Sequence, residues 1–322
     1  GKATITNMGA ELGATTSIFP YDERMARYLR ATGRSGFATV ADDHLELLRA
    51  DDEVERDPSA HFDRVVEIDL AKLEPHVVGP HSPDRARPIS AMAKEIEEEG
   101  FPDKLSVALV GSCTNSSYED MSRCADVARQ ATEHGLQAVS EFMITPGSEQ
   151  VRATIARDGQ QAALEELGGM VLANACGPGI GQWKREGVPD GEPNSIVTSY
   201  NRNFPKRNDA NSGTMNFITS PELAVAMSLS GRLSFNPLTD TLTGADGKEF
   251  MLEAPGPAPE VPAGGFDAGE QGYVAPPEDG SSIDVNVDPN STRLQILEPW
   301  PAWDGEDFKA MPVLVKAAGK CT

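Results

Sequence analysis

The chain alternates short apolar runs with helical segments, and this alternation limits its fold more than any other feature of the sequence. Residues 105–111 read L-S-V-A-L-V-G, which is typical of a buried parallel strand, and residues 118–135 predict a helix with acids in its first turn and glycine at its end. Further strands are predicted at 139–145, 170–175 and 195–199, and further helices at 146–159, 162–167 and 220–231. This order predicts an α/β domain with a mostly parallel sheet covered on both faces.

Three loops rich in small and polar residues follow predicted strands. They read G-S-C-T-N-S-S from Gly111, N-A-C-G-P-G-I-G-Q-W from Asn174 and S-Y-N-R-N-F-P-K-R-N-D from Ser199. Ligands of open α/β sheets bind at the carboxyl ends of the strands, so we expect the three loops to form one site. Trp183 at the end of the second loop is predicted to be a packing anchor.

Changes in composition suggest three parts. Residues 51–58 are acidic, and residues 75–88 are rich in proline and histidine, which places a boundary near Pro75. Proline, glycine and acids dominate residues 254–289, as in an extended linker. We therefore predict parts at 1–74, 75–265 and 266–322. An ordered pattern is expected to resume at Ser291 and to include a strand-like apolar run near the end of the chain.

The charge balance excludes some classes of ligand. The chain has 50 acidic and 28 basic residues, a net charge of −22, so its surface should repel nucleic acid. No apolar run is long enough for a membrane span, and no secretory signal is evident, so we expect an intracellular protein of a bacterial cytoplasm or a mitochondrial matrix. The five histidines, at 44, 61, 76, 81 and 134, lie outside the three loops and are predicted at surface or capping positions.

Four cysteines, at 113, 124, 176 and 321, are too few and too scattered for a disulfide scaffold. Cys113 and Cys176 follow predicted strands and precede flexible loop residues. Two thiolates at neighbouring strand ends suit a soft metal or an iron–sulfur cluster, and buried unreactive thiols are the alternative. Cys124 lies within the predicted helix and is expected to pack against the core.

The third loop carries Asn201, Arg202 and Arg207. Two arginines close together at a strand end suit forked binding of carboxylate or phosphate groups, although loop arginines are often merely solvated.

Several segments closely resemble the aconitase family, particularly its mitochondrial-type branch. They are G-S-C-T-N-S-S-Y-E-D-M, T-P-G-S-E-Q-V-R-A-T-I, L-A-N-A-C-G-P-G-I-G-Q-W, T-S-Y-N-R-N-F-P-K-R-N-D-A-N, N-M-G-A-E-L-G-A-T-T-S-I-F-P-Y and F-N-P-L-T-D. The resemblance implies a three-layer α/β/α domain, the end of a preceding α/β domain and an extended linker. It also implies a hydro-lyase of the tricarboxylic acid cycle that interconverts citrate and isocitrate through cis-aconitate on a 4Fe–4S cluster.

In that family three cysteines hold the cluster, and the open fourth iron serves as a Lewis acid. By resemblance, Cys113 and Cys176 are two of the three ligands. Gly179 occupies the position of the third and has no side chain to bind iron. We therefore expect weak cluster binding by this chain.

The resemblance also assigns five further residues to the site. Glu11 matches a catalytic residue near the substrate hydroxyl, and Asn7 matches a neighbour that reaches the active site. Asn201, Arg202 and Arg207 match the loop that binds substrate carboxylates. A small tricarboxylate is thus the implied ligand, with no role for a membrane or nucleic acid.

Histidines, a serine and a further arginine of the family's machinery belong to domains that this chain does not contain, so the fragment is expected to be inactive without those partner domains. Two alternatives remain open. One is a degenerate, cluster-free binding or assembly module. The other is a related homoaconitase or isopropylmalate-type dehydratase that acts on another 2-hydroxy acid.

Overall fold

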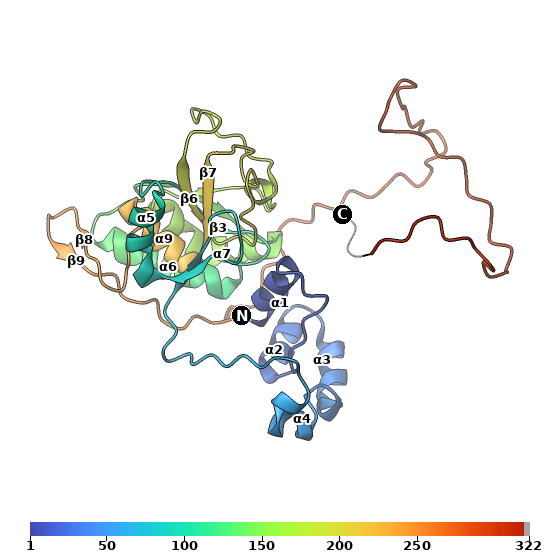
Figure 1. Ribbon diagram of the computed structural model, residues 1–322, viewed down its shortest axis with the longest axis horizontal. Helices are drawn as coiled ribbons and strands as arrows, with labels where there is room; N and C mark the ends of the chain where they lie inside the picture. Colours follow the sequence, from blue (N-terminus) through green and yellow to red (C-terminus); the bar gives the residue numbers. More distant parts are fainter. Residues whose placement is uncertain (319–322) are drawn as a thin grey trace. The chain divides into compact units, whose positions relative to one another are not determined.

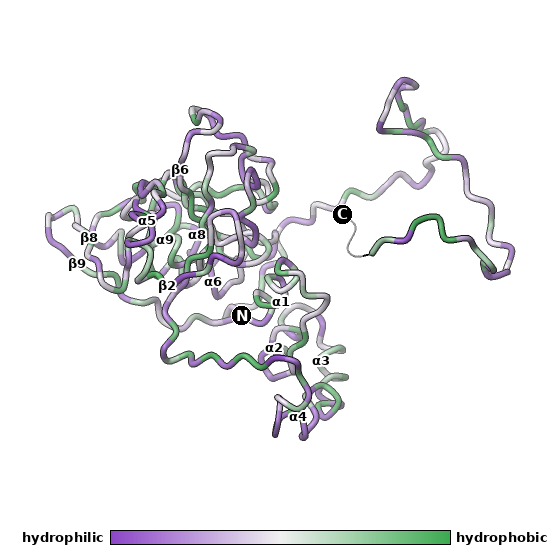
Figure 2. Tube along the Cα trace, viewed as in Figure 1, coloured by the Kyte–Doolittle hydropathy of each residue, from purple (hydrophilic) through white to green (hydrophobic). Residues whose placement is uncertain are grey.

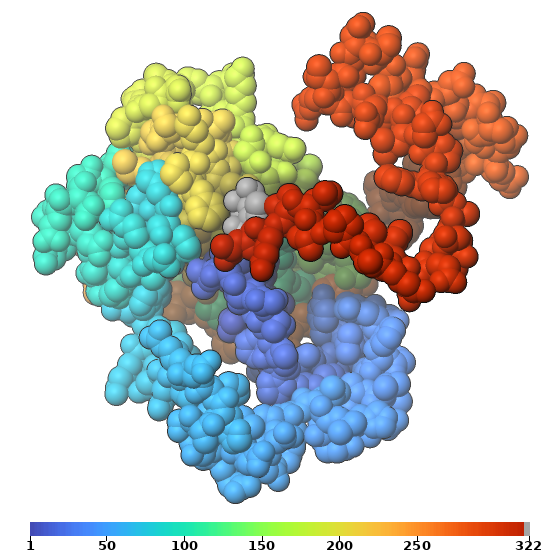
Figure 3. Space-filling view, turned by 45° about the vertical axis from the view of Figure 1, so that its right-hand side comes forward, coloured from blue at the N-terminus to red at the C-terminus, as the bar shows by residue number. Residues whose placement is uncertain are grey.

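The computed structural model describes residues 1–318 (Figure 1). They divide into two units, the first Gly1–Gln271 and the second beginning at Gly272. All helices and strands of the described residues lie in the first unit. The second unit has neither, and in the space-filling view its residues, orange to red, form a string without a packed interior (Figure 3).

A seven-stranded sheet forms the centre of the first unit, in the order β2-β1-β7-β6-β3-β4-β5. The strands are β1 (His76–Val78), β2 (Ala86–Pro88), β3 (Leu105–Gly111), β4 (Glu141–Thr145), β5 (Met170–Val171), β6 (Asn194–Thr198) and β7 (Thr214–Ile218). The five strands from β7 to β5 are parallel, whereas β1 pairs antiparallel with β2 and β7. The predicted α/β class with a mostly parallel sheet is confirmed.

Alternation along the strands divides the core between the two faces of the sheet. Ala108 and Val110 of β3 join the larger core, which also contains side chains of the helices α5 (Met92–Glu99), α6 (Tyr118–Glu133), α7 (Glu149–Asp158), α8 (Gln160–Glu166) and α9 (Pro221–Ser230). Val107 and Leu109 face a smaller core with Tyr200. Leu172 and Trp183 pack against this second core, so loop segments cover that face, and Trp183 is a packing residue as predicted.

The predicted helices have the expected ends. Ser117 and Asp120 form a capping box at the start of α6, and Gly135 follows its end at φ +72°. Helices α7 and α9 end at Gly159 and Gly231, both left-handed. Cys124 is fully buried on α6, which confirms its packing role.

Four helices precede the sheet: α1 (Lys2–Glu11), α2 (Glu23–Ala31), α3 (Ser35–Asp42) and α4 (Asp52–Arg56). A short hairpin of β8 (Leu242–Thr243) and β9 (Glu249–Phe250) follows α9. The ring of His134 stacks on Phe250 at 3.7 Å, while His81 is half-buried next to the cis peptide between Gly79 and Pro80. Within residues 1–318, no helix is both long and apolar enough to cross a bilayer.

Two predictions about secondary structure are wrong, and one strand was missed. The strand expected at 170–175 ends at Val171, because β5 pairs only with the end of β4. Strand β7 was not predicted, since its T-M-N-F-I sequence mixes polar and apolar residues. The segment from Ser291 to residue 318 has no helix or strand, and its apolar run, green in Figure 2, is exposed, with Leu314 at 93%. Cys321 lies outside the described residues.

Candidate functional site

Three loops follow the carboxyl ends of β3, β5 and β6. They are the β3 loop (residues 112–117), the cysteine loop (172–193) and the arginine loop (199–213). Strands β6, β3, β4 and β5 are consecutive neighbours and run parallel, so these ends meet at one edge of the sheet. The structure therefore brings together the three loops that the sequence assigned to one site.

Two cysteines from different loops approach each other at this edge. The Sγ atoms of Cys113 and Cys176 are 3.8 Å apart, although 63 residues separate them in the chain. Cys113 is exposed and Cys176 is half-buried. Burial raises the pKa of the Cys176 thiol, and the nearby Arg207 guanidinium offsets part of this effect.

Gly179 lies in a short 3₁₀ turn, Gly177–Ile180, and its amide donates to the carbonyl of Cys176 over 2.7 Å. A Cβ atom at this position would lie 2.9 Å from Cδ2 of Tyr200. Tyr200 is 1% exposed, and its hydroxyl is 2.9 Å from the hydroxyl of Thr145. The space beside Gly179 is thus occupied by an aromatic ring.

Helix α1 contributes a carboxylate to the same edge. Glu11 at its C-terminal end accepts hydrogen bonds from Asn201, over 2.9 Å, and from Arg202. This contact raises the pKa of Arg202, so the guanidinium stays charged. One turn earlier, Asn7 donates to the hydroxyl of Thr114, beside Cys113. Helix α1 therefore contacts both the β3 loop and the arginine loop.

Two buried polar atoms in these loops, Oγ of Ser112 and Nε of Arg207, have no hydrogen-bond partner among residues 1–318. Unpartnered buried donors are costly and rare in native proteins. Each of these two loops therefore holds one donor that can bond a ligand or a water molecule.

The residues assigned from sequence thus fall into two contacting groups. Cys113 and Cys176 form one, and Glu11, Asn201 and Arg202 form the other, while Asn7 joins α1 to the β3 loop. Sequence reasoning missed Tyr200, whose ring fills the space at Gly179. Its place directly after the strand predicted at 195–199 was the available signal, since an aromatic residue at the end of a buried strand often faces the core.

The donor set for a metal is small. Among residues 1–318, no three His, Cys, Asp or Glu side chains are grouped to hold an ion. The third thiol in this range, Cys124, is buried in α6, and desolvation raises its pKa well above the usual value. Two thiols are therefore the soft ligands at the site.

Known proteins match the whole chain. The model of the Aconitase family (aconitate hydratase) matches residues 1–231. A mitochondrial aconitate hydratase of Gracilaria gracilis is 58% identical over 322 residues, which are all of this chain and 40% of that protein. That of Arthroderma benhamiae is 55% identical and a probable one of Dictyostelium discoideum is 54% identical, each over the whole chain and 41% of the relative.

The chain thus spans about two fifths of the length of these relatives. The family match covers more than half of the chain and includes all three loops. The chain therefore belongs to the aconitase family.

Proposed function

We propose that the protein to which this sequence belongs is an aconitate hydratase, which interconverts citrate and isocitrate through cis-aconitate in the tricarboxylic acid cycle. The observation that carries this proposal is the meeting of Cys113 and Cys176 with the Glu11–Arg202 group at one edge of the sheet. The names of the relatives support it. Those names also favour a mitochondrial matrix, with a bacterial cytoplasm as the alternative.

In this proposal the arginine loop binds the substrate. The unpartnered Nε of Arg207 is a ready donor for a carboxylate, and Arg202 and Asn201 supply further donors. Glu11 is held by these two residues, so its carboxylate has a fixed position from which to accept a hydrogen bond from the substrate hydroxyl. Asn7 orients the β3 loop through Thr114.

The family implies a 4Fe–4S cluster held by three thiolates, and the residues of this chain do not fit that group. Two thiols converge, the third position is Gly179, and the ring of Tyr200 occupies the space where its side chain would start. We infer that this chain binds no stoichiometric cluster and is inactive alone. No step of the reaction is therefore assigned to the cluster here.

A second candidate is favoured by Gly179 itself, namely a cluster-free module that binds a ligand or partner. The retained Glu11, Asn201 and Arg202 contacts support the enzyme lineage instead, since a scaffold has no evident need for this set. A net charge of −22 disfavours nucleic acid as that ligand.

Citrate binding tests the role of the arginine loop. We expect calorimetry to detect weak citrate binding to this chain, and Arg207→Gln to weaken it by about tenfold because a charged donor to a carboxylate is lost. Arg24→Gln is the control, since it removes the same charge from a side chain that is 72% exposed on α2. Equal loss in both variants would show a general charge effect and contradict the proposal.

A further inference from the structure

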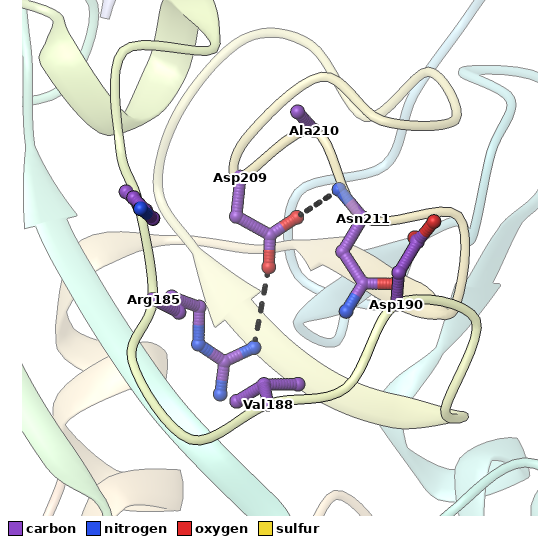
Figure 4. A pocket seen from close by; sticks show the side chains of 7 residues that line it. Arg185, Val188, Asp190, Asp209, Ala210 and Asn211 are labelled. Carbon is purple, nitrogen blue, oxygen red and sulfur yellow. Dashed lines mark hydrogen bonds and ion pairs between the residues drawn. The ribbon is translucent and has the colours of Figure 1, made fainter.

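A small cavity lies between the cysteine loop and the arginine loop. It has a volume of about 150 Å³ and is lined by residues that include Arg185, Asp190, Asp209 and Asn211 (Figure 4). The charged groups of Arg185, Asp190 and Asp209 already have partners in the chain. Arg185 bonds Asn194 over 2.6 Å and Asp209 over 3.4 Å, so the cavity offers few free groups to a ligand.

The side chains around the cavity instead connect the cysteine loop to the arginine loop. The Arg185 and Asp209 side chains are 8% and 1% exposed, so their ion pair is buried. Asp209 also accepts a hydrogen bond from Thr214 over 2.7 Å. Asn211 donates to the carbonyl of Pro189 over 3.0 Å. The arginine loop therefore holds the second half of the cysteine loop at several points, which also include the hydrogen bond from the Gly191 amide to Asn211.

Asn208 connects the arginine loop to the first half of the cysteine loop. It is 2% exposed, and its amide donates to the carbonyl of Pro178 over 3.0 Å. Within the described residues, the stretch 175–184 has no other side-chain hydrogen bond to the rest of the chain apart from the contact between the Cys176 and Cys113 thiols. Its backbone hydrogen bonds, such as that of Gln182, are internal, apart from the one that the Ala175 amide donates to the carbonyl of Ala173.

We propose that Asn208 and Asp209 are positioning residues that fix Cys176 relative to the rest of the site. They directly follow Arg207, so the turn that presents this arginine also sets the place of the cysteine loop. The consequence for catalysis rests on the proposed function. The claim that these residues fix Cys176 does not rest on the proposed function, because it concerns only the spacing of the two thiols.

The test measures how well the chain binds phenylarsine oxide, a trivalent arsenical that must bond both thiols at once. Its affinity depends on the effective concentration of one thiol near the other, which falls when a loop is loosened. We expect Asn208→Ala to weaken arsenical binding by about tenfold. A smaller loss of affinity is expected for Arg185→Lys, which keeps the positive charge but loses the forked guanidinium.

Ser195→Ala is the matched control. It also removes one buried hydrogen bond to a backbone carbonyl, that of Pro102 over 2.6 Å, but at the other end of β6. We expect it to lower the unfolding midpoint by a similar amount and to leave arsenical affinity unchanged. Maleimide labelling of the buried Cys124 detects any variant that unfolds. If Asn208→Ala unfolds, the arsenical affinity of Arg185→Lys decides the test.

Equal arsenical affinity in Asn208→Ala, Arg185→Lys and the unchanged chain would overturn the proposal. The measurement uses neither iron nor substrate. A failure here is therefore distinct from a failure of citrate binding, which would count against the proposed function.

Discussion

The two loops that bring a cysteine to the site are held in different ways. The β3 loop is held by its contact with strand β4 and by the helix α6 that directly follows it. Gly111 and Ser112 turn with φ of +110° and +67°, the Ser112 amide donates to Thr145, and Ser117 caps α6. The cysteine loop has a short 3₁₀ turn of its own and depends on side chains of the arginine loop.

This difference indicates which part of the site can change without loss of the fold. The position of Cys113 follows from a strand and a capped helix that the core requires. The position of Cys176 follows from hydrogen bonds between two surface loops, together with the packing of Leu172 and Trp183 on the smaller core. If residue 179 is a ligand position, as we propose, a change there alters the chemistry of the site while the sheet and its helices remain.

The largest effect is expected at Gly111. A Cβ atom there would lie 1.9 Å from the carbonyl oxygen of Thr145, and φ is +110°. Backbone must move, so Gly111→Ala should lower the free energy of unfolding by about 4 kcal/mol or more in urea titration. Gly177→Ala in the cysteine loop, with no atom within 4 Å, should cost far less. Similar costs for both would remove the contrast between the loops.

A smaller effect is expected at Gly179. In the absence of iron and sulfide, Gly179→Ala and Gly179→Cys should each lower the free energy of unfolding by about 1–2 kcal/mol, because the new Cβ must displace Tyr200. Tyr200→Phe keeps the ring and removes its hydroxyl contact with Thr145, so it should ease this displacement. A stabilising Gly179→Ala, measured by urea unfolding, would show that the ring yields freely.

The smallest effect on stability is expected at Glu149, which bonds Asn174 at the start of the cysteine loop. Glu149 accepts hydrogen bonds from Arg152 and Asn174, and chiefly the Arg152 contact lowers the pKa of this carboxyl to about 2. A lowered pKa stabilises the fold above the usual carboxyl pKa, 4.5, and this stabilisation is lost as the pH falls toward 2.

Glu149→Gln should therefore be less stable than the unchanged chain at neutral pH, and the gap should close between pH 4.5 and 2 in urea unfolding. A gap that is constant over this range would mean that the contacts of Glu149 do not depend on its charge.

The helices and most parallel strands could be predicted because their signals are local. The 118–135 segment carries its own cap and terminal glycine, and residues 105–111 are apolar throughout. Strand β7 and the short β5 depend on their neighbours in the sheet, so propensity alone missed them. The apolar residues near 314 have no partner surface in the described chain, and no strand forms there.

The site was predicted in part for the same reason. The three loops could be placed together because the ends of parallel strands meet. The resemblance supplied Asn7 and Glu11, which lie more than 100 residues before Cys113 and form a helix against the loops. The sequence carries a signal for the burial of Tyr200, but not for its place beside Gly179, and none for Asn208, because these contacts with the cysteine loop exist only in the folded chain.

The most direct test of the account is anaerobic reconstitution with iron and sulfide of the unchanged chain and of Gly179→Cys, side by side. Visible absorbance and iron per chain are measured, and Gly179→Ala controls for the effect of the added Cβ. We expect a stoichiometric cluster in Gly179→Cys and none in the other two. Equal cluster content in the unchanged chain and Gly179→Cys would contradict the claim that residue 179 is a lost ligand position.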